Sequence, residues 1–312
     1  MVVSSGLPPI FAQTPIALVA AEVVAEFPAN TFLESIAVSP DNTLFITDHL
    51  NGSVWRIGAD GQTILHAKIA GKATGLVCLP NGNLLLSAWD EQNVATVFNI
   101  SPDGETSVLV TLPDAIFLNG MTPLSGGSLL DGTEPILIAD SYRGVIWLLN
   151  VPEKTVHIWL EHPYLVRSSP DKEFPAVNGL KIYDGVLYAS NTEKMQLVKI
   201  PIVNGQPGEP EVFVTPINLD DFAFDQEGNL YGTTHIYNSV VRIAPEGTVT
   251  VIAEAEAGMT GSTALAFGRG ESDRTSVYVV TNGGMSFPPA TGVELAKVIR
   301  LEAGIPGLPI GK

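Results

Sequence analysis

Short apolar runs separated by polar turns recur along almost the whole chain. In each copy, an apolar run is followed by a turn with Gly or Asn, a second apolar run with a polar end, a polar loop and a further apolar run. The two clearest copies are SIAVSPDNTLFITDHLNGSVWRI (35–57) and DFAFDQEGNLYGTTHIYNSVVRI (221–243), which align without a gap. Runs of this length, joined by Asp-Gly, Asn-Gly or Glu-Gly, predict β-strands connected by hairpins.

Further copies fall between and after these two, at 75–100, 120–151, 179–202 and 263–284. The first apolar anchors of the six copies are Ile36, Leu76, Met121, Leu180, Phe222 and Ala264. A period of about forty residues with three or four strands per unit is typical of a β-propeller blade. We therefore expect an all-β, six-bladed β-propeller with about four antiparallel strands per blade. A pair of β-sandwiches is the alternative, and the gapless copies argue against it.

The two ends of the chain are expected to close the ring. The segment EVVAEF (22–27) reads as a strand that completes the blade formed by the C-terminal repeat. We therefore expect an N-terminal extension over residues 1–21 and a single propeller domain over residues 22–312. A chain of 312 residues is long enough for one large domain with a sizeable core.

One polar position recurs at the start of every repeat. In a propeller the first strand of each blade lines the central channel, so equivalent positions form a ring around the axis. The residues two positions before the six anchors are Glu34, Thr74, Asn119, Asn178, Asp220 and Ser262. Carboxylates and carboxamides are hard oxygen donors of the kind that Ca²⁺ accepts. The ring therefore predicts a divalent-cation site, and a wet polar channel without an ion is the alternative.

Other residues are expected near this ring. Asp221 follows Asp220, and we expect it either to point between blades or to reach the pocket as a base. His49, Trp89 and His235 each lie thirteen positions after an anchor, past the second strand, where loops open on the same end as the ring. Histidine titrates near neutral pH and can carry protons. A rim histidine without a chemical role is the alternative interpretation.

The longest insertion between repeats is EHPYLVRSSPDKEFPAV (161–177). It is expected over the same end of the channel, as a lid or a loop that shapes the substrate pocket. Tyr164 and Arg167 in this insertion are candidate pocket residues. No Gly-x-Ser-x-Gly motif marks a serine nucleophile, and Cys78 sits in an apolar run, where a core role is expected.

Charge and composition narrow the class of partner. The formal net charge is −17, which argues against binding to nucleic acid or to an anionic membrane surface. The single cysteine excludes an intramolecular disulfide. The first 27 residues lack a basic region, and no apolar run is long enough for a membrane span. We expect a monomer in the cytoplasm that acts on a small molecule, or a periplasmic or secreted protein if a leader has been removed.

Several stretches resemble the senescence marker protein, gluconolactonase and luciferin-regenerating enzyme family, over roughly residues 22–303. They are LESIAVSPDNTLFITD, VNGLKIYDGVLYASNT, LDDFAFDQEGNLYG and STALAFGRGESDRTSVYVVT. This family consists of six-bladed, metal-dependent propellers that are related in fold to paraoxonases and strictosidine synthase. The resemblance implies Glu34, Asn178 and Asp220 as metal ligands. It also implies Asn119 as a residue near metal and substrate.

The sequence departs from the family pattern around these residues. Ser35-Ile36 follows the glutamate in place of Gly-Pro, Leu219-Asp220-Asp221 replaces Pro-Asp-Gly, and Gly120 follows the asparagine in place of Asp. These changes bear on the sugar-lactone substrate more than on the metal. The motifs FLNGMT, LIADSYRGVIW, LDDFAFD and GSTALAFGR resemble a subgroup common in fungi, in which some members are described as hetero-Diels-Alderases.

Three functions remain as alternatives. The first is a Ca²⁺-dependent hydrolase of lactones or related esters, with Mg²⁺, Mn²⁺ or Zn²⁺ as other metals. Here Asp220 or Asp221 serves as base, and His49 or His235 carries protons. The second is a non-hydrolytic cyclase or pericyclase that orients its substrate. The third is a ligand-binding propeller without turnover. The residues expected to bind substrate are Asn119, Trp89, Thr74, Ser262, Tyr164 and Arg167.

Overall fold

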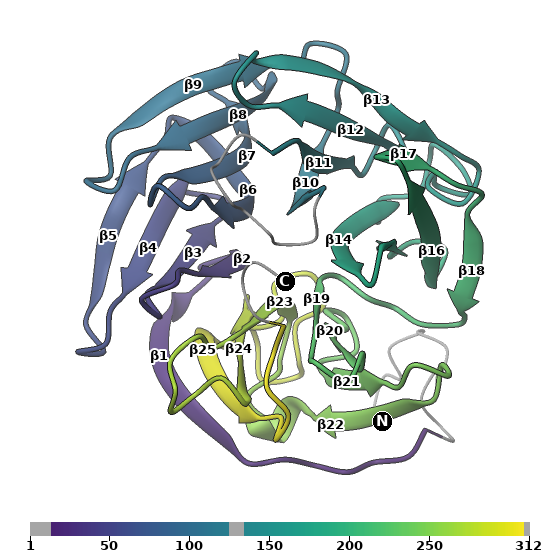
Figure 1. Cartoon of the computed structure of the whole chain (residues 1–312). Coiled ribbons are helices and arrows are strands. Elements are labelled where there is room, and N and C mark those ends of the chain that lie inside the picture. Colours follow the sequence, from purple (N-terminus) through teal and green to yellow (C-terminus); the bar gives the residue numbers. More distant parts are fainter. Residues whose placement is uncertain (1–13, 125–133, 309–312) are drawn as a thin grey trace.

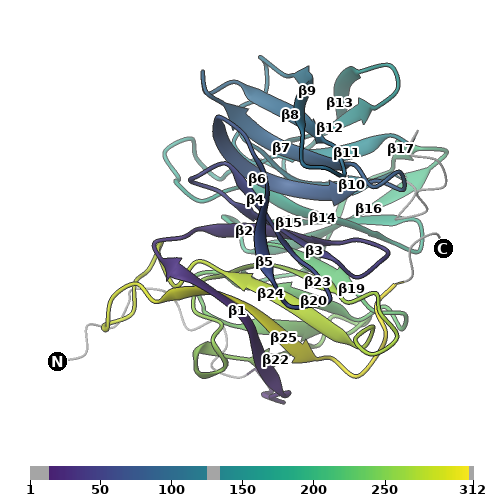
Figure 2. The same ribbon diagram turned by 90° about the vertical axis from the view of Figure 1, so that its left-hand side faces the viewer.

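The structure is a six-bladed β-propeller, as the repeat predicted. It is a computed structural model that describes residues 14–124 and 134–308. Six antiparallel sheets stand around a central axis, with the first strand of each innermost (Figure 1). Seen from the side, the strands of neighbouring blades cross in a twisted stack (Figure 2). The described residues hold one short 3₁₀ helix, Ala255–Ala257, and no helix long and apolar enough to span a membrane.

The first three blades follow one another along the chain with four strands each. Blade 1 contains β2 (Leu33–Val38), β3 (Leu44–Asp48), β4 (Ser53–Ile57) and β5 (Thr63–Lys68). Blade 2 contains β6 (Gly71–Cys78), β7 (Leu84–Asp90), β8 (Ala95–Ile100) and β9 (Thr106–Thr111). Blade 3 contains β10 (Leu118–Pro123), β11 (Ile136–Asp140), β12 (Val145–Asn150) and β13 (Thr155–Glu161).

The remaining blades repeat this order, with one extra strand in blade 4. Blade 4 contains β14 (Val177–Tyr183), β15 (Val186–Asn191), β16 (Gln196–Val203), β17 (Gln206–Pro207) and β18 (Glu211–Val214). Blade 5 contains β19 (Phe222–Phe224), β20 (Leu230–Thr233), β21 (Val240–Ile243) and β22 (Val249–Ala253). Blade 6 contains β23 (Ser262–Phe267), β24 (Ser276–Thr281), β25 (Leu295–Glu302) and the N-terminal strand β1 (Ala21–Ala29).

The N-terminal strand closes the ring in the way the sequence predicted. Strand β1 pairs antiparallel with β25 and becomes the outermost strand of blade 6. It begins at Ala21, one residue before the predicted domain boundary. Before it, Ala17 and Val19 donate backbone hydrogen bonds to β22 of blade 5. The described part of the predicted extension therefore runs along the edge of a blade.

The core explains why most strands read as continuous apolar runs. Alternate residues of a strand point to opposite faces of its sheet. In β11, Ile136 and Ile138 pack in the cluster between blades 2 and 3, while Leu137 and Ala139 pack in the cluster between blades 3 and 4. Six such clusters lie at the six joins between neighbouring blades. Both faces of each blade are buried, so both sets of residues must be apolar.

Candidate functional site

The predicted polar ring surrounds a small hollow on the propeller axis. Its lining includes Glu34, Asn119, Asn178, Asp220 and Asp221. In five blades the inner strand has a register shift at this level, which allows two consecutive residues to approach the axis together. Asp220 and Asp221 lie just before β19 and both line the hollow. This places Asp221 at the pocket, which was one of the two positions expected for it.

Glycines beside the ring residues allow neighbouring inner strands to approach each other closely. A Cβ atom added at Gly75 would lie 2.2 Å from the carbonyl oxygen of Asn119, and one at Gly120 would lie 2.5 Å from that of Asn178. At Gly179 it would lie 2.7 Å from Oδ1 of Asp221. Neighbouring inner strands therefore meet backbone to backbone at the ring, and a side chain at these positions would push them apart.

Glu34 faces this hollow without a hydrogen-bond donor. Within the described parts of the chain, no group donates a hydrogen bond to its carboxylate. Burial raises the pKa of Glu34 well above its usual value, and the charges of Asp220 and Asp221 raise it further. A half-buried carboxylate that faces two others is costly when it is ionised, unless a cation compensates it.

Asp220 is held by two donors from different elements. Asn178 Nδ2 donates to Oδ1 of Asp220, and His235 Nδ1 lies 2.9 Å from its Oδ2. The Asn178 amide nitrogen also reaches the hydroxyl of Thr192, at 3.1 Å. Among the described residues, the side-chain Oδ1 atoms of Asn178 and Asn119 have no hydrogen-bond donor. Both amide oxygens are therefore available to a cation.

His235 follows the second strand of blade 5 and connects the ring to the mouth of the channel. Its backbone φ is 40°, a conformation that residues other than glycine seldom adopt unless their surroundings hold them there. Nε2 lies 2.9 Å from Asn282 Nδ2 and 3.3 Å from the hydroxyl of Ser286. Since Nδ1 donates to Asp220, Nε2 is the atom that accepts on this side.

Asp221 forms an ion pair that the sequence did not indicate. Lys181 Nζ lies 2.6 Å from Oδ1 of Asp221, and both side chains are less than one-third exposed. The pair neutralises one of the three carboxylates around the hollow. Asp221 is therefore tied to a lysine, whereas Glu34 has no counter-ion among the residues that the structure describes.

Thr74 and Ser262 occupy ring positions, but their hydroxyls make internal bonds. Thr74 Oγ1 bonds to the carbonyl oxygens of Ser87 and Leu118, and Ser262 Oγ donates to that of Ser239. Both side chains are fully buried, and neither lines the hollow. The structure thus places them at joins within and between blades, and a role in substrate binding for them remains a prediction.

The predicted rim residues belong to a row of rings at the mouth. Phe32 contacts His49 and His235, with ring centroids 5.5 and 6.0 Å away. Trp89 stacks on Phe117 at 4.4 Å. The Nε1–H of Trp89 donates to the Ile116 carbonyl, and His49 Nδ1 bonds to the Ala73 carbonyl. Burial lowers the pKa of His49, so this ring is neutral at neutral pH. A ligand at the mouth would therefore meet the faces of these rings, because the N–H group of Trp89 and the Nδ1 atom of His49 are already bonded to carbonyls.

The 161–177 insertion lies at this end of the propeller, as expected. Its backbone accepts bonds from Asn191, and Phe174 stacks on Phe287 of the blade 6 loop with centroids 5.9 Å apart. Arg167 lies over the ring of Tyr142 and donates to the carbonyls of Lys172 and Tyr142. Tyr164 is exposed. Arg167 is thus occupied by contacts within the loops, and its pocket role, like that of Tyr164, remains a prediction.

The ring's donor set fits a hard divalent cation. In residues 14–124 and 134–308, no three His, Cys, Asp or Glu side chains are placed to hold a metal by themselves. A cation would therefore need the carboxamide oxygens of Asn119 and Asn178 beside the carboxylates of Glu34 and Asp220. Such an all-oxygen set suits Ca²⁺, with water in the remaining positions. The unpartnered Glu34 carboxylate is the observation that supports this fit.

Sequence reasoning missed a set of hydroxyls that hold the ring in place. Side chains of the second strands donate to carbonyls of the next blade's ring segment. They are Thr47, Ser87, Ser190 and Thr233, which donate to Thr74, Asn119, Asp220 and Thr263 respectively. A single Ser or Thr within the second strand of blades 1, 2, 4 and 5 was the available signal.

Comparisons with known proteins agree on the fold. No family model and no curated protein matches this sequence. The structure is similar to regucalcin from Agrobacterium tumefaciens, a calcium-binding protein, with a TM-score of 0.72 and 16% identity over 96% of this chain and 98% of that chain. It is also similar to a luciferin-regenerating enzyme, with a TM-score of 0.71 and 16% identity over 94% and 99%. A gluconolactonase from Xanthomonas campestris has a TM-score of 0.67 and 13% identity over 92% and 89%.

At these identities the similarity establishes a shared six-bladed propeller fold. These structures belong to the family that the sequence resembles. The fold that was expected from that resemblance is therefore confirmed.

Proposed function

We propose that this protein is a divalent-cation-dependent hydrolase of lactones or related esters, with Ca²⁺ as the favoured ion. The observation that carries the proposal is the Glu34 carboxylate, which faces Asp220 and Asp221 and has no hydrogen-bond donor in the part of the chain that the structure describes. Glu34, Asn178 and Asp220 would hold the ion, and Asn119 would orient the substrate beside it. When bound, the cation would polarise the ester carbonyl and stabilise the oxyanion that develops there.

The protein side of the mechanism rests on His235. Asp220 accepts the Nδ1–H of His235, which orients the ring and leaves Nε2 as the basic atom toward the mouth. Once the attacking water replaces Asn282 Nδ2 as its hydrogen-bond donor, Nε2 takes a proton from that water and returns it to the leaving alkoxide. Asp221 is a weaker candidate for this role because Lys181 already holds it. His49 is also weaker because its Nδ1 faces a neutral backbone carbonyl, whereas that of His235 faces the carboxylate of Asp220.

One observation favours a second candidate. The rings of Phe32, Trp89 and Phe117 give the mouth an apolar wall suited to a planar, unsaturated substrate. A cyclase would use this wall to orient the substrate, with no consumption of water.

The test is a screen of lactones and aryl esters with protein freed of metal by chelation and then supplied with Ca²⁺. Each product is examined by mass spectrometry. Hydrolysis is expected to depend on Ca²⁺, to add one water to the substrate and to be lost in Glu34→Gln. Hydrolysis that persists in chelator would contradict the proposed role of the cation. Conversion of a polyene without change of mass would favour the cyclase.

A further inference from the structure

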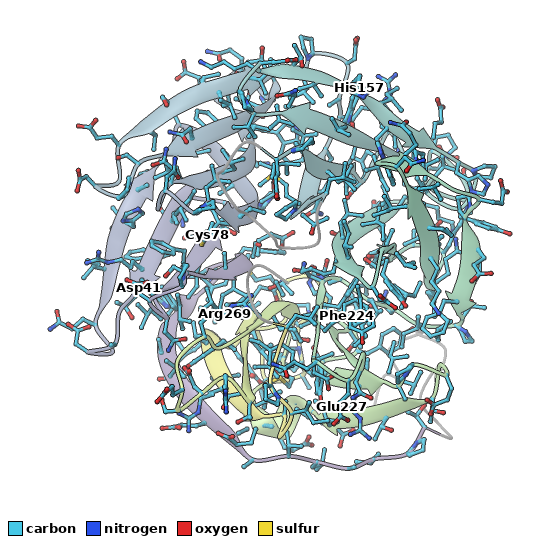
Figure 3. All side chains as sticks on the ribbon, in the orientation of Figure 1. Asp41, Cys78, His157, Phe224, Glu227 and Arg269 are labelled. Carbon is cyan, nitrogen blue, oxygen red and sulfur yellow. The ribbon has the colours of Figure 1, made fainter. Side chains whose placement is uncertain are left out.

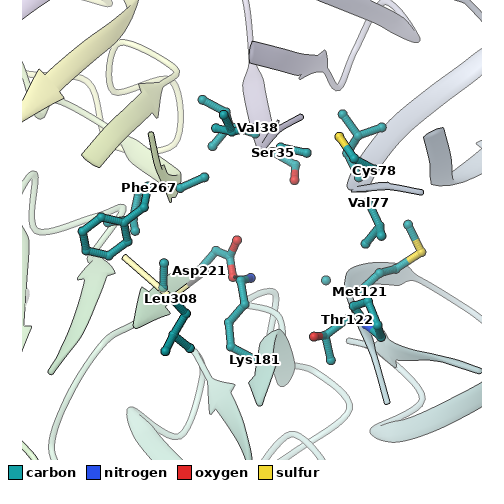
Figure 4. Close-up of a pocket in the computed structure, with 18 of the residues that line it drawn as sticks. Ser35, Val38, Val77, Cys78, Met121, Thr122, Lys181, Asp221, Phe267 and Leu308 are labelled. Atoms are coloured by element: carbon teal, nitrogen blue, oxygen red, sulfur yellow. Dashed lines mark hydrogen bonds and ion pairs between the residues drawn. The ribbon is translucent and has the colours of Figure 1, made fainter. Parts of the chain in front are cut away.

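A second and larger hollow lies in the central channel, next to the ring. It has a volume of about 210 Å³ and is bounded by residues of all six inner strands (Figure 4). It shares Ser35, Gly120 and Asp221 with the ring's hollow, so the two adjoin. It extends toward the hairpins that join first and second strands, away from the mouth with its histidines. We call this hollow the lower chamber.

The walls of the lower chamber are largely apolar. They include Val38, Val77, Met121, Phe267 and Leu308. Its ionisable side chains are Lys181, Asp221, Arg269 and Cys78. Lys181 and Asp221 neutralise each other through their ion pair, which Figure 4 shows in the chamber. Burial raises the pKa of the Cys78 thiol to about 12, so this group is neutral.

Arg269 therefore supplies a positive charge that has no ion-pair partner in residues 14–124 and 134–308. Among the described residues no carboxylate forms an ion pair with its guanidinium, although the chain as a whole carries a net charge of −17. The buried Nε atom has no hydrogen-bond partner, while Nη1 donates to the carbonyl of Leu308. Figure 3 shows Arg269 and Cys78 on the side of the blades that faces the axis.

The position of Arg269 is fixed by a neighbouring blade. Its backbone N–H donates to Asn42 Oδ1 at 2.7 Å, and Asn42 Nδ2 donates to Asp273 Oδ2, also at 2.7 Å. Asn42 belongs to the hairpin of blade 1, and Arg269 and Asp273 belong to that of blade 6. An isolated cation in a largely apolar hollow is costly unless an anion meets it, and burial accordingly lowers the pKa of Arg269.

We infer that the lower chamber binds a small monocarboxylate with an apolar body. Its carboxylate meets the guanidinium of Arg269, which lines the chamber, and its hydrocarbon part lies against the walls of Val77, Met121 and Phe267. The volume of about 210 Å³ is many times the ~10–15 Å³ that a single water needs on the same measure, so a carboxylate with a chain of about six carbons has room. This site is separate from the hydrolytic proposal, because it needs neither the cation nor His235.

Calorimetric titration with hexanoate tests the site, in chelator so that no metal at the ring can bind the carboxylate. Hexanoate is expected to bind at least tenfold more tightly than hexanamide, which has the same length without the charge. Arg269→Gln should weaken hexanoate binding at least tenfold. Arg274→Gln, an exposed arginine in the same hairpin, and Glu34→Gln should leave it unchanged. Equal binding of hexanoate and hexanamide, or unchanged binding in Arg269→Gln, would overturn the inference.

Two further variants keep the test decisive. Ala37 lines the chamber, so Ala37→Leu fills part of it while Arg269 remains. This variant should also lose hexanoate, even if Arg269→Gln proves unstable, and undiminished binding in it would contradict the site. A full-length chain whose C-terminal carboxylate is converted to an amide loses that charge and keeps Leu308 within the chain. If the amidated chain binds hexanoate and the unmodified chain does not, the protein's own terminus is the anion and the inference of a free ligand fails.

Discussion

His235 Nδ1 lies 2.9 Å from Asp220 Oδ2, and this contact joins the mouth of the channel to the ring at its centre. Asp220 precedes the first strand of blade 5 and His235 follows the second. The hairpin of one blade therefore brings them together. The contact determines which nitrogen of the imidazole faces Asn282 and Ser286. It also gives Asp220 two roles, as a candidate ligand for the cation and as the residue that orients a base.

The first prediction separates a water nucleophile from a serine nucleophile. Ser286 Oγ lies 3.3 Å from His235 Nε2, within reach of a serine–histidine–aspartate arrangement. Because the proposed reaction uses water, Ser286→Ala should retain activity within about threefold. His235→Asn should lose roughly a hundredfold or more, as expected for removal of a general base. Equal losses in the two variants, or an acyl-enzyme trapped in the wild type, would replace water with Ser286.

The second prediction concerns stability without metal. Glu34→Gln removes one of three carboxylates around the hollow and breaks no hydrogen bond among the described residues. The chelated variant should be more stable than the chelated wild type by about 1 kcal/mol, which amounts to roughly 2 °C in Tm. Ca²⁺ should raise the Tm of the wild type and not that of Glu34→Gln. Glu105→Gln, at an exposed position, is the control and should behave like the wild type. A chelated Glu34→Gln that melts below the wild type would contradict the repulsion.

The third prediction gives the pH dependence of the same effect. The pKa of Glu34 in the folded state is raised above its ordinary value of 4.5, so the folded state retains this proton to higher pH than the unfolded state. Stability of the chelated protein should therefore fall as the pH rises above about 4.5 and through the raised pKa. Glu34→Gln should lack this fall, so the two melting curves should coincide at low pH and separate above it. Parallel curves across the range would show that Glu34 is not the group responsible.

The fourth prediction tests the tightness of the ring. A Cβ atom at position 179 would lie 2.7 Å from Asp221 Oδ1 and 2.8 Å from the Asp220 carbonyl. Gly179→Ala should therefore destabilise the protein by about 1–3 kcal/mol and weaken Ca²⁺ binding. Gly58→Ala is a suitable control, because its Cβ would meet only Asp60 Oδ1, at 3.2 Å. If Gly179→Ala binds Ca²⁺ as tightly as the wild type does, the close approach of the strands at position 179 is not needed for the site, and the prediction is wrong.

The fold was predictable because the repeat is visible in the chain itself. Ile36 and Phe222 begin copies that align without a gap, and the six anchors mark six inner strands. Closure by the N-terminal strand was also predictable, since the last repeat lacked an outer strand. The ring followed from the same alignment, because equivalent positions of repeated blades must lie at the same level of the channel.

The directions of individual side chains at the ring were not predictable from the repeat. Thr74 shares its position with Asp220, but its hydroxyl can reach the backbone of the next blade and bonds there. The register shifts at the ring in five of the blades depend on how adjacent strands pair, which a single strand's sequence does not specify. Lys181 and Arg269 were missed for a similar reason. Lys181 pairs with a residue of the next blade, and Arg269 is positioned by a residue of blade 1, so the local sequence indicates neither contact.

The central claim is that the ring binds a divalent cation through Glu34, Asn178 and Asp220. Calorimetric titration of the chelated protein with Ca²⁺ tests it most directly, beside Glu34→Gln, Asn178→Ala and Asp220→Asn. The account predicts one site in the wild type, at least tenfold weaker binding in each of the three variants, and unchanged binding in Glu105→Gln. A wild type that takes up no Ca²⁺, or three variants that bind it as the wild type does, would contradict the account.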